Sequence, residues 1–401
     1  MLAEPAEPRR PLNLRNLDGR GMADALAGFG VSAEVARRVF SAVHREGAPS
    51  IEAAQPGIRG LGRVAARAID AAAPWRDLEI IERRRAADGF LKYLFRLPDG
   101  AEVEAVRIPL PDPAAARALR AARAEGQAAG GLTALPTAKY TVCLSSQVGC
   151  ALACDFCATG RLGGIRSLET WEIVAQLRLV ASEAEHPIRG AVFMGMGEPL
   201  LNYANVVRAA RIFSDPAGPA IAAKAISIST AGVVPAIRRY IDERQPYRLI
   251  FSLGAPTSAA RAALMPIERR WPLGELLPAI RAYVAATGQR ATIAYVAIGG
   301  PDGNTTPEHA RQLAALLGDL RVKLNLIDVS DDTGRYQPPS PGELDAFRDA
   351  LDREVGVPVV RRYSGGKDIG AACGTLAASQ RGGVALEPRA PRLLPVVSNG
   401  S

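Results

Sequence analysis

The sequence CLSSQVGCALACDFC, residues 143–157, holds four of the five cysteines of this chain. Cys150, Cys154 and Cys157 have the spacing Cys-x3-Cys-x2-Cys, and Cys143 lies seven residues before them. The fifth cysteine, Cys373, is more than two hundred residues away in DIGAACGTL. Five cysteines in a chain of 401 residues do not make a disulfide framework, so the grouping indicates metal or redox chemistry.

Thiolates at this spacing fit three corners of a four-iron iron–sulfur cluster. Such a cluster with only three protein ligands leaves one iron open to another molecule. Structural zinc is the alternative, but zinc sites usually have two ligand pairs, and Cys143 on a predicted strand is an unusual fourth ligand. The three histidines, His44, His186 and His309, are scattered, which argues against a His-ligated catalytic zinc and against a Ser-His-Asp triad. Iron–sulfur is therefore favoured over zinc.

The composition predicts a large protein of the cytoplasm. Hydrophobic residues make up 48% of the chain, and the sequence has no uninterrupted apolar run of about 18 residues that would predict a membrane span. The N-terminus is polar and lacks the apolar core of a secretory signal. The net charge is +8 and the pI about 9.5. This charge suits a polyanion partner such as nucleic acid, but a sequence that merely favours Arg would show it too.

Short β-type runs alternate with helical segments between residues 137 and 385, and this alternation predicts a parallel sheet or barrel. In such folds the ligand lies at the C-terminal ends of the strands. The cysteine run, MGMGEP, STAG and SLGA each follow a predicted strand, so four loops are expected to meet at one rim. The predicted strands lie near residues 140–144, 191–194, 225–229, 248–253, 292–298, 322–327 and 359–363.

Three further regions are expected outside this core. Residues 1–75 predict a helical accessory domain, for which RNA binding is one candidate role. Residues 76–136 predict an antiparallel β meander followed by a short exposed helix and a flexible insertion. Residues 386–401 are rich in Pro and predict a disordered tail.

Glu104 is out of place in the meander. In VEAVRIP it shares a strand face with Val106 and Ile108, because side chains alternate along a strand. A carboxylate on an apolar face either lies at a sheet edge or is held for acid–base work. Taken alone, the residue favours the sheet edge.

Several motifs, in order, resemble the RlmN/Cfr family of radical S-adenosylmethionine (SAM) RNA methyltransferases. They are SSQVGCALACDFCATG, VFMGMGEPLLNYANV, STAGVVPAI and GGKDIGAACGTL, and the resemblance covers roughly residues 77–378. It implies an α/β fold, a partial (βα) barrel of the radical SAM type, with the helical domain and the β extension added. It also implies a [4Fe-4S] cluster on Cys150, Cys154 and Cys157 whose open iron binds SAM.

The resemblance assigns the residues around SAM. Gly197 and Glu198 of GMGEP match the family's contacts with the methionine end, where a carboxylate can accept a hydrogen bond from the ammonium group. Ser229 and the backbone around Ser252, Leu253 and Gly254 match the contacts with the adenosyl and ribose end.

The resemblance also gives the other cysteines a role. In the family, a first SAM methylates a distant cysteine, which aligns with Cys373, and a 5′-deoxyadenosyl radical from a second SAM takes hydrogen from that methyl group. The carbon adds to C2 or C8 of an adenine in ribosomal or transfer RNA. Glu104 aligns with the proton acceptor, and Cys143 aligns with the cysteine that resolves the adduct through a disulfide with Cys373. An electron donor such as flavodoxin is implied.

Two departures from the family pattern concern SAM. The family's Ser-Leu-His-Ala is SLGA here, with Gly254 in place of histidine, and the family's ligand-contacting Asn is Ser330. A Gly254→His variant is expected to bind SAM a few-fold more tightly, unless neighbouring residues fill the space. Two alternatives to an RNA adenine methylase stay open: a radical SAM enzyme acting on a small molecule or peptide, and a non-catalytic iron–sulfur or zinc protein that binds RNA.

Overall fold

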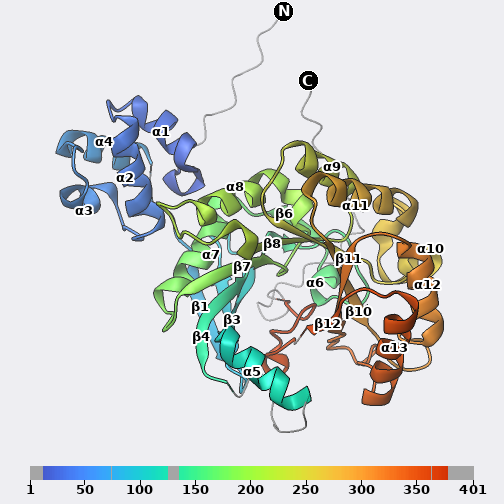
Figure 1. Ribbon diagram of the computed structural model, residues 1–401. Coiled ribbons are helices and arrows are strands. Elements are labelled where there is room, and N and C mark those ends of the chain that lie inside the picture. Colours follow the sequence, from blue (N-terminus) through green and yellow to red (C-terminus); the bar gives the residue numbers. More distant parts are fainter. Residues whose placement is uncertain (1–11, 74, 125–134, 363, 378–401) are drawn as a thin grey trace, which may run out of the picture.

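The computed structural model shows a helical lobe beside a large curved sheet with helices on its outer face (Figure 1). The structure describes residues 12–73, 75–124, 135–362 and 364–377. The predicted tail at 386–401 and most of the predicted flexible insertion lie outside the described residues.

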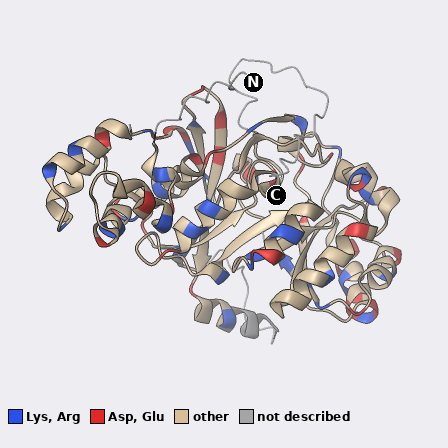
Figure 2. Ribbon diagram, turned by 90° about the horizontal axis from the view of Figure 1, so that it is seen from above, with Lys and Arg blue, Asp and Glu red and all other residues tan. Residues whose placement is uncertain are grey.

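The N-terminal lobe contains α1 (Gly19–Ala27), α2 (Ala33–His44), α3 (Ile51–Ala54) and α4 (Arg63–Ala72). The helices α1, α2 and α3 begin at Asp or Ser side chains that accept a backbone N–H of the first turn, which is the usual N-cap arrangement. The lobe stands apart from the sheet in two perpendicular views (Figures 1 and 2). The helices expected in this region are present, and the lobe's role as a separate domain stays a prediction.

The β meander is confirmed, and it is part of the main sheet. The strands β1 (Glu79–Arg85), β2 (Leu91–Arg96), β3 (Glu102–Pro111) and β4 (Thr137–Cys143) pair antiparallel in sequence order. The expected position of Glu104 at a sheet edge is wrong, because β3 lies between β2 and β4. The helix α5 (Pro113–Ala124) follows β3, where a short helix was expected.

From β4 onward the described strands of the main sheet are parallel, in the order β4-β7-β8-β9-β10-β11-β12. Because this order never reverses, right-handed connections place every crossover helix on the same face. Within the described residues β1 and β12 are the two free edges, so the barrel is open, as expected for a partial barrel. The added strands are β7 (Ile188–Phe193), β8 (Ile226–Thr230), β9 (Arg248–Ser252), β10 (Ala291–Ala297), β11 (Val322–Asp328) and β12 (Val359–Arg362).

The crossover helices cover the outer face of these strands (Figure 1). The helix α7 begins at Thr170, and Glu169 is its N-cap, in a capping box with Glu172. The crossover helices are α7 (Thr170–Ser182), α8 (Tyr203–Ser214), α9 (Val234–Asp242), α11 (Leu273–Thr287), α12 (Pro307–Leu317) and α13 (Pro341–Glu354). The shorter elements are β5 (Gln147–Gly149), α6 (Ala158–Arg161), β6 (Gly164–Ser167) and α10 (Ser258–Leu264).

Strand alternation gives the sheet its two chemical faces. In β8, sequence ISIST, Ile226 and Ile228 are fully buried, whereas Ser229 is only partly buried. Successive side chains point to opposite faces of a strand, so the Ile side chains pack in the core while Ser229 reaches the inner face of the open barrel. Among the described residues no helix is long and apolar enough to span a membrane.

Candidate active site

The cluster loop, Cys150–Cys157, lines a cavity of about 160 Å³ at the C-terminal ends of the parallel strands. We call this space the cluster cavity. All three cysteines of the Cys-x3-Cys-x2-Cys motif line it. The strand-end positions that line it with them are Met194, Gly195, Gly197, Glu198, Ser229, Ser252, Ala294, Asp328 and Ser330.

Neighbouring segments fix the shape of the cluster loop. The Asp155 carboxylate accepts hydrogen bonds from the Tyr336 hydroxyl at 2.5 Å and from Arg335 Nη1 at 2.9 Å. A Cβ atom at Gly160 would lie 2.8 Å from the carbonyl oxygen of Cys154, so the turn after the loop has no room for a side chain. The loop is therefore held by the segment after β11 and by close packing of its own backbone.

The donor set fits an iron–sulfur cluster. Burial raises the pKa of Cys150, Cys154 and Cys157, because a thiolate loses its solvation there. Bound cations are the natural compensation for three buried thiolates. In the described part of the chain no three His, Cys, Asp or Glu side chains lie close enough to share one metal ion.

Glu198 presents a buried carboxylate to the cluster cavity. Its Oε1 accepts the Leu200 N–H at 2.9 Å and its Oε2 accepts the Ala231 N–H at 2.8 Å. Burial raises the pKa of Glu198 to about 7, although the two N–H donors oppose that shift. Gly197 before it has φ +97°, and a Cβ there would lie 2.5 Å from Gln147 Cβ, so only glycine fits. The carboxylate is fixed in place and has lone pairs left for a cationic ligand.

The residues expected at the adenosyl end divide into two groups. The hydroxyls of Ser229 and Ser252 lie 3.4 Å apart, and both residues line the cluster cavity. Leu253 and Gly254 lie behind that wall instead, and their carbonyl oxygens accept hydrogen bonds from Arg261 and Asn304. Their part in cofactor binding stays a prediction.

The space beside Gly254 is already filled. Gly254 has φ +76°, and a Cβ there would lie 2.4 Å from Met265 Sδ. Met265 itself lines the cluster cavity. Ser330 lines the cavity too, and its buried hydroxyl has no hydrogen-bond partner among the described residues, so it is available to a ligand.

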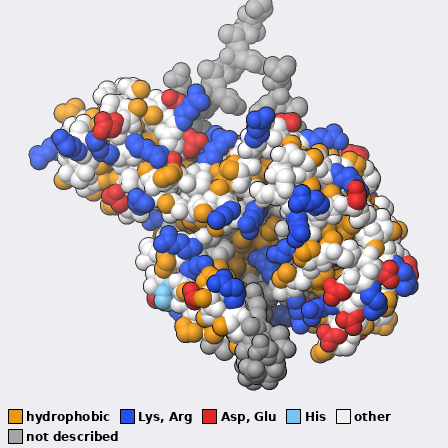
Figure 3. All heavy atoms as spheres, in the orientation of Figure 1, with side chains coloured by type: hydrophobic (Ala, Val, Ile, Leu, Met, Phe, Trp, Pro, Cys, Tyr) orange, Lys and Arg blue, Asp and Glu red, His pale blue; other side chains and the backbone are white. Residues whose placement is uncertain are grey.

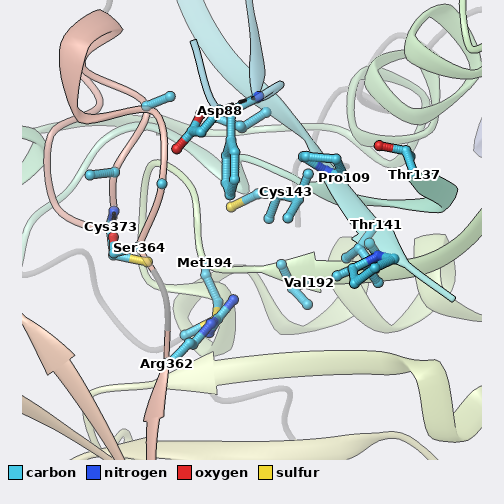
Figure 4. Close-up of a pocket in the computed structure, with 18 of the residues that line it drawn as sticks. Asp88, Pro109, Thr137, Thr141, Cys143, Val192, Met194, Arg362, Ser364 and Cys373 are labelled. Carbon is cyan, nitrogen blue, oxygen red and sulfur yellow. Dashed lines mark hydrogen bonds between the residues drawn. The ribbon is translucent and has the colours of Figure 1, made fainter. Parts of the chain in front are cut away.

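Cys143 and Cys373 line a second cavity, of about 360 Å³, which we call the cysteine-pair cavity. Their sulfur atoms face each other across it (Figure 4). Burial raises the pKa of Cys143 to about 12, and the neighbouring Cys373 adds to that shift. Cys373 and Met194 also line the cluster cavity, so the two spaces meet at these side chains. All five cysteines are free thiols, and the expected Cys143–Cys373 disulfide is not formed in this structure.

Glu104 lines a third cavity, of about 560 Å³, and does not line the cysteine-pair cavity. Its Oε1 lies 3.0 Å from the Lys92 ammonium, and its Oε2 accepts the Ala377 N–H at 3.0 Å. Burial raises the pKa of Glu104, while Lys92 lowers it. The segment that carries Cys373 contributes Gly370 and Ala377 to the wall of the third cavity. The same segment lines the cysteine-pair cavity, so it separates Glu104 from that cavity.

Sequence reasoning missed three residues of the site. Asp328 ends β11 in the wall of the cluster cavity, with its side chain 13% exposed and its carboxylate paired with Arg361. An Asp at the end of the apolar run KLNLID could have drawn attention to it. Nothing in the sequence marked Met265 or Lys92, because their roles depend on contacts between segments far apart in the chain.

Lys and Arg side chains surround a hollow between the β1–β4 side and the β10–β12 side of the molecule (Figure 3). Arg362, at the end of β12, lines the cysteine-pair cavity and donates to Met194 Sδ at 2.7 Å. Positive charge at the mouth of a cavity favours an anionic substrate.

Comparison with known proteins matches residues 144–317 to the Radical SAM superfamily. The chain is 49% identical over 375 residues to a "Probable RNA methyltransferase" of Myxococcus xanthus, covering 94% of this chain and 97% of that protein. It is 37% identical to a "Dual-specificity RNA methyltransferase RlmN" of Anaeromyxobacter dehalogenans, covering 91% of this chain and 92% of that protein.

Among solved structures, a radical SAM methyltransferase from Sphaerobacter thermophilus is similar over 92% of this chain and 100% of its own, with 35% identity and a TM-score of 0.78. The segment that matches the superfamily contains the cluster cysteines and begins directly after Cys143. It ends before Cys373, so both residues of the cysteine pair lie in its flanks.

Proposed function

Because the chain belongs to the RlmN/Cfr family of radical SAM RNA methyltransferases, we propose that it methylates an adenine carbon, C2 or C8, of ribosomal or transfer RNA through a methyl group carried on Cys373. The family implies an enzyme with a [4Fe-4S] cluster and SAM. The finer assignment rests on the arrangement of Cys373, Cys143 and Glu104.

The residues that line the cluster cavity are of the kinds that the two cofactors require. Cys150, Cys154 and Cys157 would hold the cluster, which when bound supplies the electron that splits SAM. Glu198 would accept a hydrogen bond from the methionine ammonium, as a charge-assisted interaction away from bulk water. The hydroxyls of Ser229, Ser252 and Ser330 lie on the same wall and suit the polar groups of the adenosyl end.

The observation that carries the proposal is the position of Cys373 in the walls of both cavities. A methyl carrier must meet SAM on one side and the RNA base on the other. Cys373 would meet both, because its side chain lines both cavities. The cysteine-pair cavity of about 360 Å³ has mainly apolar walls and enough room for one nucleobase.

Cys143 is proposed to release the product. Once the Cys373 methyl carbon is bonded to the adenine, attack by the Cys143 sulfur on the Cys373 sulfur forms a disulfide and breaks the link to that carbon. The electron pair of the broken bond stays with the carbon, which takes up a proton and becomes the methyl group. The resulting disulfide takes two electrons and two protons from a thiol reductant before the next cycle, and an electron donor such as flavodoxin would supply the single electron that splits SAM.

Glu104 is proposed as the acceptor of the proton that leaves the adenine, and the oxidised cluster, when bound, would take up the one electron that leaves with it. Its buried carboxylate has a raised pKa, as suits a group that gains a proton during the reaction. It faces the third cavity, so the base or the segment carrying Cys373 has to shift for this contact to form. Because Glu104 does not line the cysteine-pair cavity, the proposal requires the base or the segment that carries Cys373 to move.

Intact-protein mass spectrometry of the anaerobically reconstituted enzyme tests the proposal. After incubation with SAM, wild-type protein should gain one methyl group, and fragmentation should place it on Cys373. With rRNA or tRNA and a reductant, nucleoside analysis should show 2-methyladenosine or 8-methyladenosine, which also decides the regiochemistry.

The two cysteine variants separate the roles. Cys373→Ala should carry no methyl group and form no RNA adduct, whereas Cys143→Ala should accumulate RNA bound covalently to the protein. Methylated RNA from Cys373→Ala would contradict the proposal, and so would similar mild losses in both variants.

A further inference from the structure

The Cys373 loop, residues 364–377, is held from two sides. On one side it bonds to the helix that follows the cluster loop: Ala158 N–H donates to the Gly374 carbonyl at 2.7 Å, and the Thr159 hydroxyl donates to the Leu376 carbonyl at 2.6 Å. Any change in the cluster loop therefore reaches the backbone next to Cys373.

On the other side, one ion pair holds two points of the Cys373 loop. The Lys92 ammonium lies 3.0 Å from Glu104 Oε1 and donates to the Gly370 carbonyl at 3.1 Å. The other oxygen of Glu104 accepts the Ala377 N–H at 3.0 Å. Gly370 and Ala377 flank Cys373, three residues before it and four residues after it.

The meander places the two charges on the same sheet face. Leu94 of β2 pairs with Glu104 of β3, and Lys92 pairs with Val106, so the Lys92 and Glu104 side chains are diagonal neighbours. Their side chains are only 11% and 7% exposed. Water therefore screens this pair little, and loss of either partner would leave the other charge buried without compensation.

The backbone near Cys373 has two positions suited to a hinge. Gly370 has φ +63° and Gly374 has φ +85°, a region that glycine enters without strain. Lys92 binds the first glycine and Ala158 binds the second. Between them the Cys373 N–H donates to the Ser364 hydroxyl at 3.0 Å. The two outer contacts thus set where the Cys373 thiol lies.

We propose that Lys92 is a positioning residue of the reaction, which joins Glu104 to the Gly370 carbonyl and so holds Cys373 where the two cavities meet. The inference rests on the proposed roles of Cys373 and Glu104. When Glu104 accepts the substrate proton it becomes neutral, and its attraction for the Lys92 ammonium falls. The Cys373 loop is then released at the stage when Cys373 has to approach Cys143.

Hydrogen exchange of the purified protein without RNA tests the holding contact directly. In Lys92→Met, amide exchange in residues 369–374 should be at least about tenfold faster than in wild type, because a buried hydrogen bond to a charged group is lost. Lys92→Arg keeps the charge and should lie between the two. Lys323→Met, on β11, is the matched control and should leave exchange of the loop unchanged.

Exchange in β7 and β8 serves as the folding check and should stay unchanged in every variant. If Lys92→Met does not fold, Lys92→Gln is judged by the same criterion. Wild-type exchange of the Cys373 loop in a folded, uncharged Lys92 variant would overturn the inference.

A second measurement separates positioning from mere structural support. In Lys92→Met, Cys373 should gain its methyl group about tenfold more slowly, while SAM cleavage under reductant keeps its wild-type rate. Equal slowing of both rates would count against a positioning role. Absence of a methyl group on wild-type Cys373 would instead refute the proposed function, and the exchange result distinguishes the two failures.

Discussion

The cluster cavity and the cysteine-pair cavity are built in different ways. The cluster cavity draws nearly all its walls from consecutive loops at the ends of parallel strands, within and just beyond residues 144–317. The cysteine-pair cavity lies where the antiparallel β2–β4 region meets the end of β12, and its walls combine residues 88–143 and 362–376 with Val192 and Met194 at the end of β7. One cavity is a product of the repeating βα pattern, and the other depends on the packing of two remote segments.

This difference separates two kinds of cysteine chemistry. The three cluster cysteines occur in one loop, so a single local segment brings them together. Cys143 and Cys373 meet only when the meander and the C-terminal segment are both in place. The division suggests that the first cavity binds and activates SAM, while the second decides what receives the methyl group.

A substitution in the cluster cavity should abolish iron binding, whereas one in the cysteine-pair cavity should leave it unchanged, and this is the largest difference we expect. Cys154→Ala removes one of three cluster ligands, so reconstituted protein should bind almost no iron and lose its brown colour. Cys373→Ala lies outside the ligand set and should keep the wild-type iron content and SAM cleavage, while RNA methylation is lost. Iron and sulfide analysis measures the first outcome, and detection of 5′-deoxyadenosine measures the second. Zinc bound stoichiometrically in place of iron would refute the assignment of the cluster cavity.

The reactivity of Cys143 should show how closed the cysteine-pair cavity is. With the pKa raised to about 12, the thiol stays protonated through neutral pH and becomes a thiolate only as the pH approaches 12. An ordinary cysteine has a pKa of about 8.5, so at pH 8 the thiolate fraction of Cys143 is about a thousandfold lower. Alkylation by iodoacetamide, followed by peptide mass spectrometry, should therefore be about a thousandfold slower at Cys143 than at a free cysteine. Denatured protein is the control, in which Cys143 should react at the ordinary rate.

Rapid alkylation of Cys143 in the folded protein would mean that the second cavity opens readily without RNA. The separation of the two cavities would then be a property of one conformation only.

The sequence predicted the cluster cavity better than the cysteine-pair cavity, for a physical reason. The βα alternation and the four unusual loops placed Cys150, Glu198, Ser229 and Ser252 on one rim, because the C-terminal ends of parallel strands meet at one edge. Their common position needed only local patterns, whereas the roles of Glu198, Ser229 and Ser252 toward SAM came from the family resemblance. Cys373 gained its role from the family resemblance, since no local pattern links it to Cys143.

Tertiary contacts explain what the sequence could not give. Glu104 was expected at a sheet edge, but the pairing of β3 with β4 across a long insertion buries it beside Lys92. Gly254 was expected to leave free space, whereas Met265 from the segment after α10 fills it. The surroundings of Glu104 and of Gly254 each depend on a segment that is remote in sequence. The periodicity of a strand does not predict which segment that will be.

Glu198→Gln should weaken SAM binding by about a hundredfold, which corresponds to about 3 kcal/mol. The substitution keeps the shape of the side chain but removes the charge that would bind the methionine ammonium. Isothermal titration of the reconstituted, unreduced enzyme with SAM measures the change. Glu275→Gln, at the exposed start of α11, is the matched control and should bind SAM as wild type does. Unchanged SAM affinity in Glu198→Gln would remove Glu198 from the binding site and leave the cluster as the main anchor.

Gly254→His should have the smallest effect, and it should destabilise the fold rather than tighten SAM binding. A histidine at φ +76° costs about 1–2 kcal/mol for the left-handed backbone, and its Cβ would displace Met265 Sδ from a packed position. Because Met is flexible, part of that crowding relaxes, so we expect a loss of about 2 kcal/mol in the free energy of unfolding, measured by denaturant titration. Adding Met265→Ala should recover the crowding cost but leave the backbone cost. A Gly254→His protein as stable as wild type, with SAM bound several-fold more tightly, would show that this wall can rearrange to admit the histidine of the family pattern.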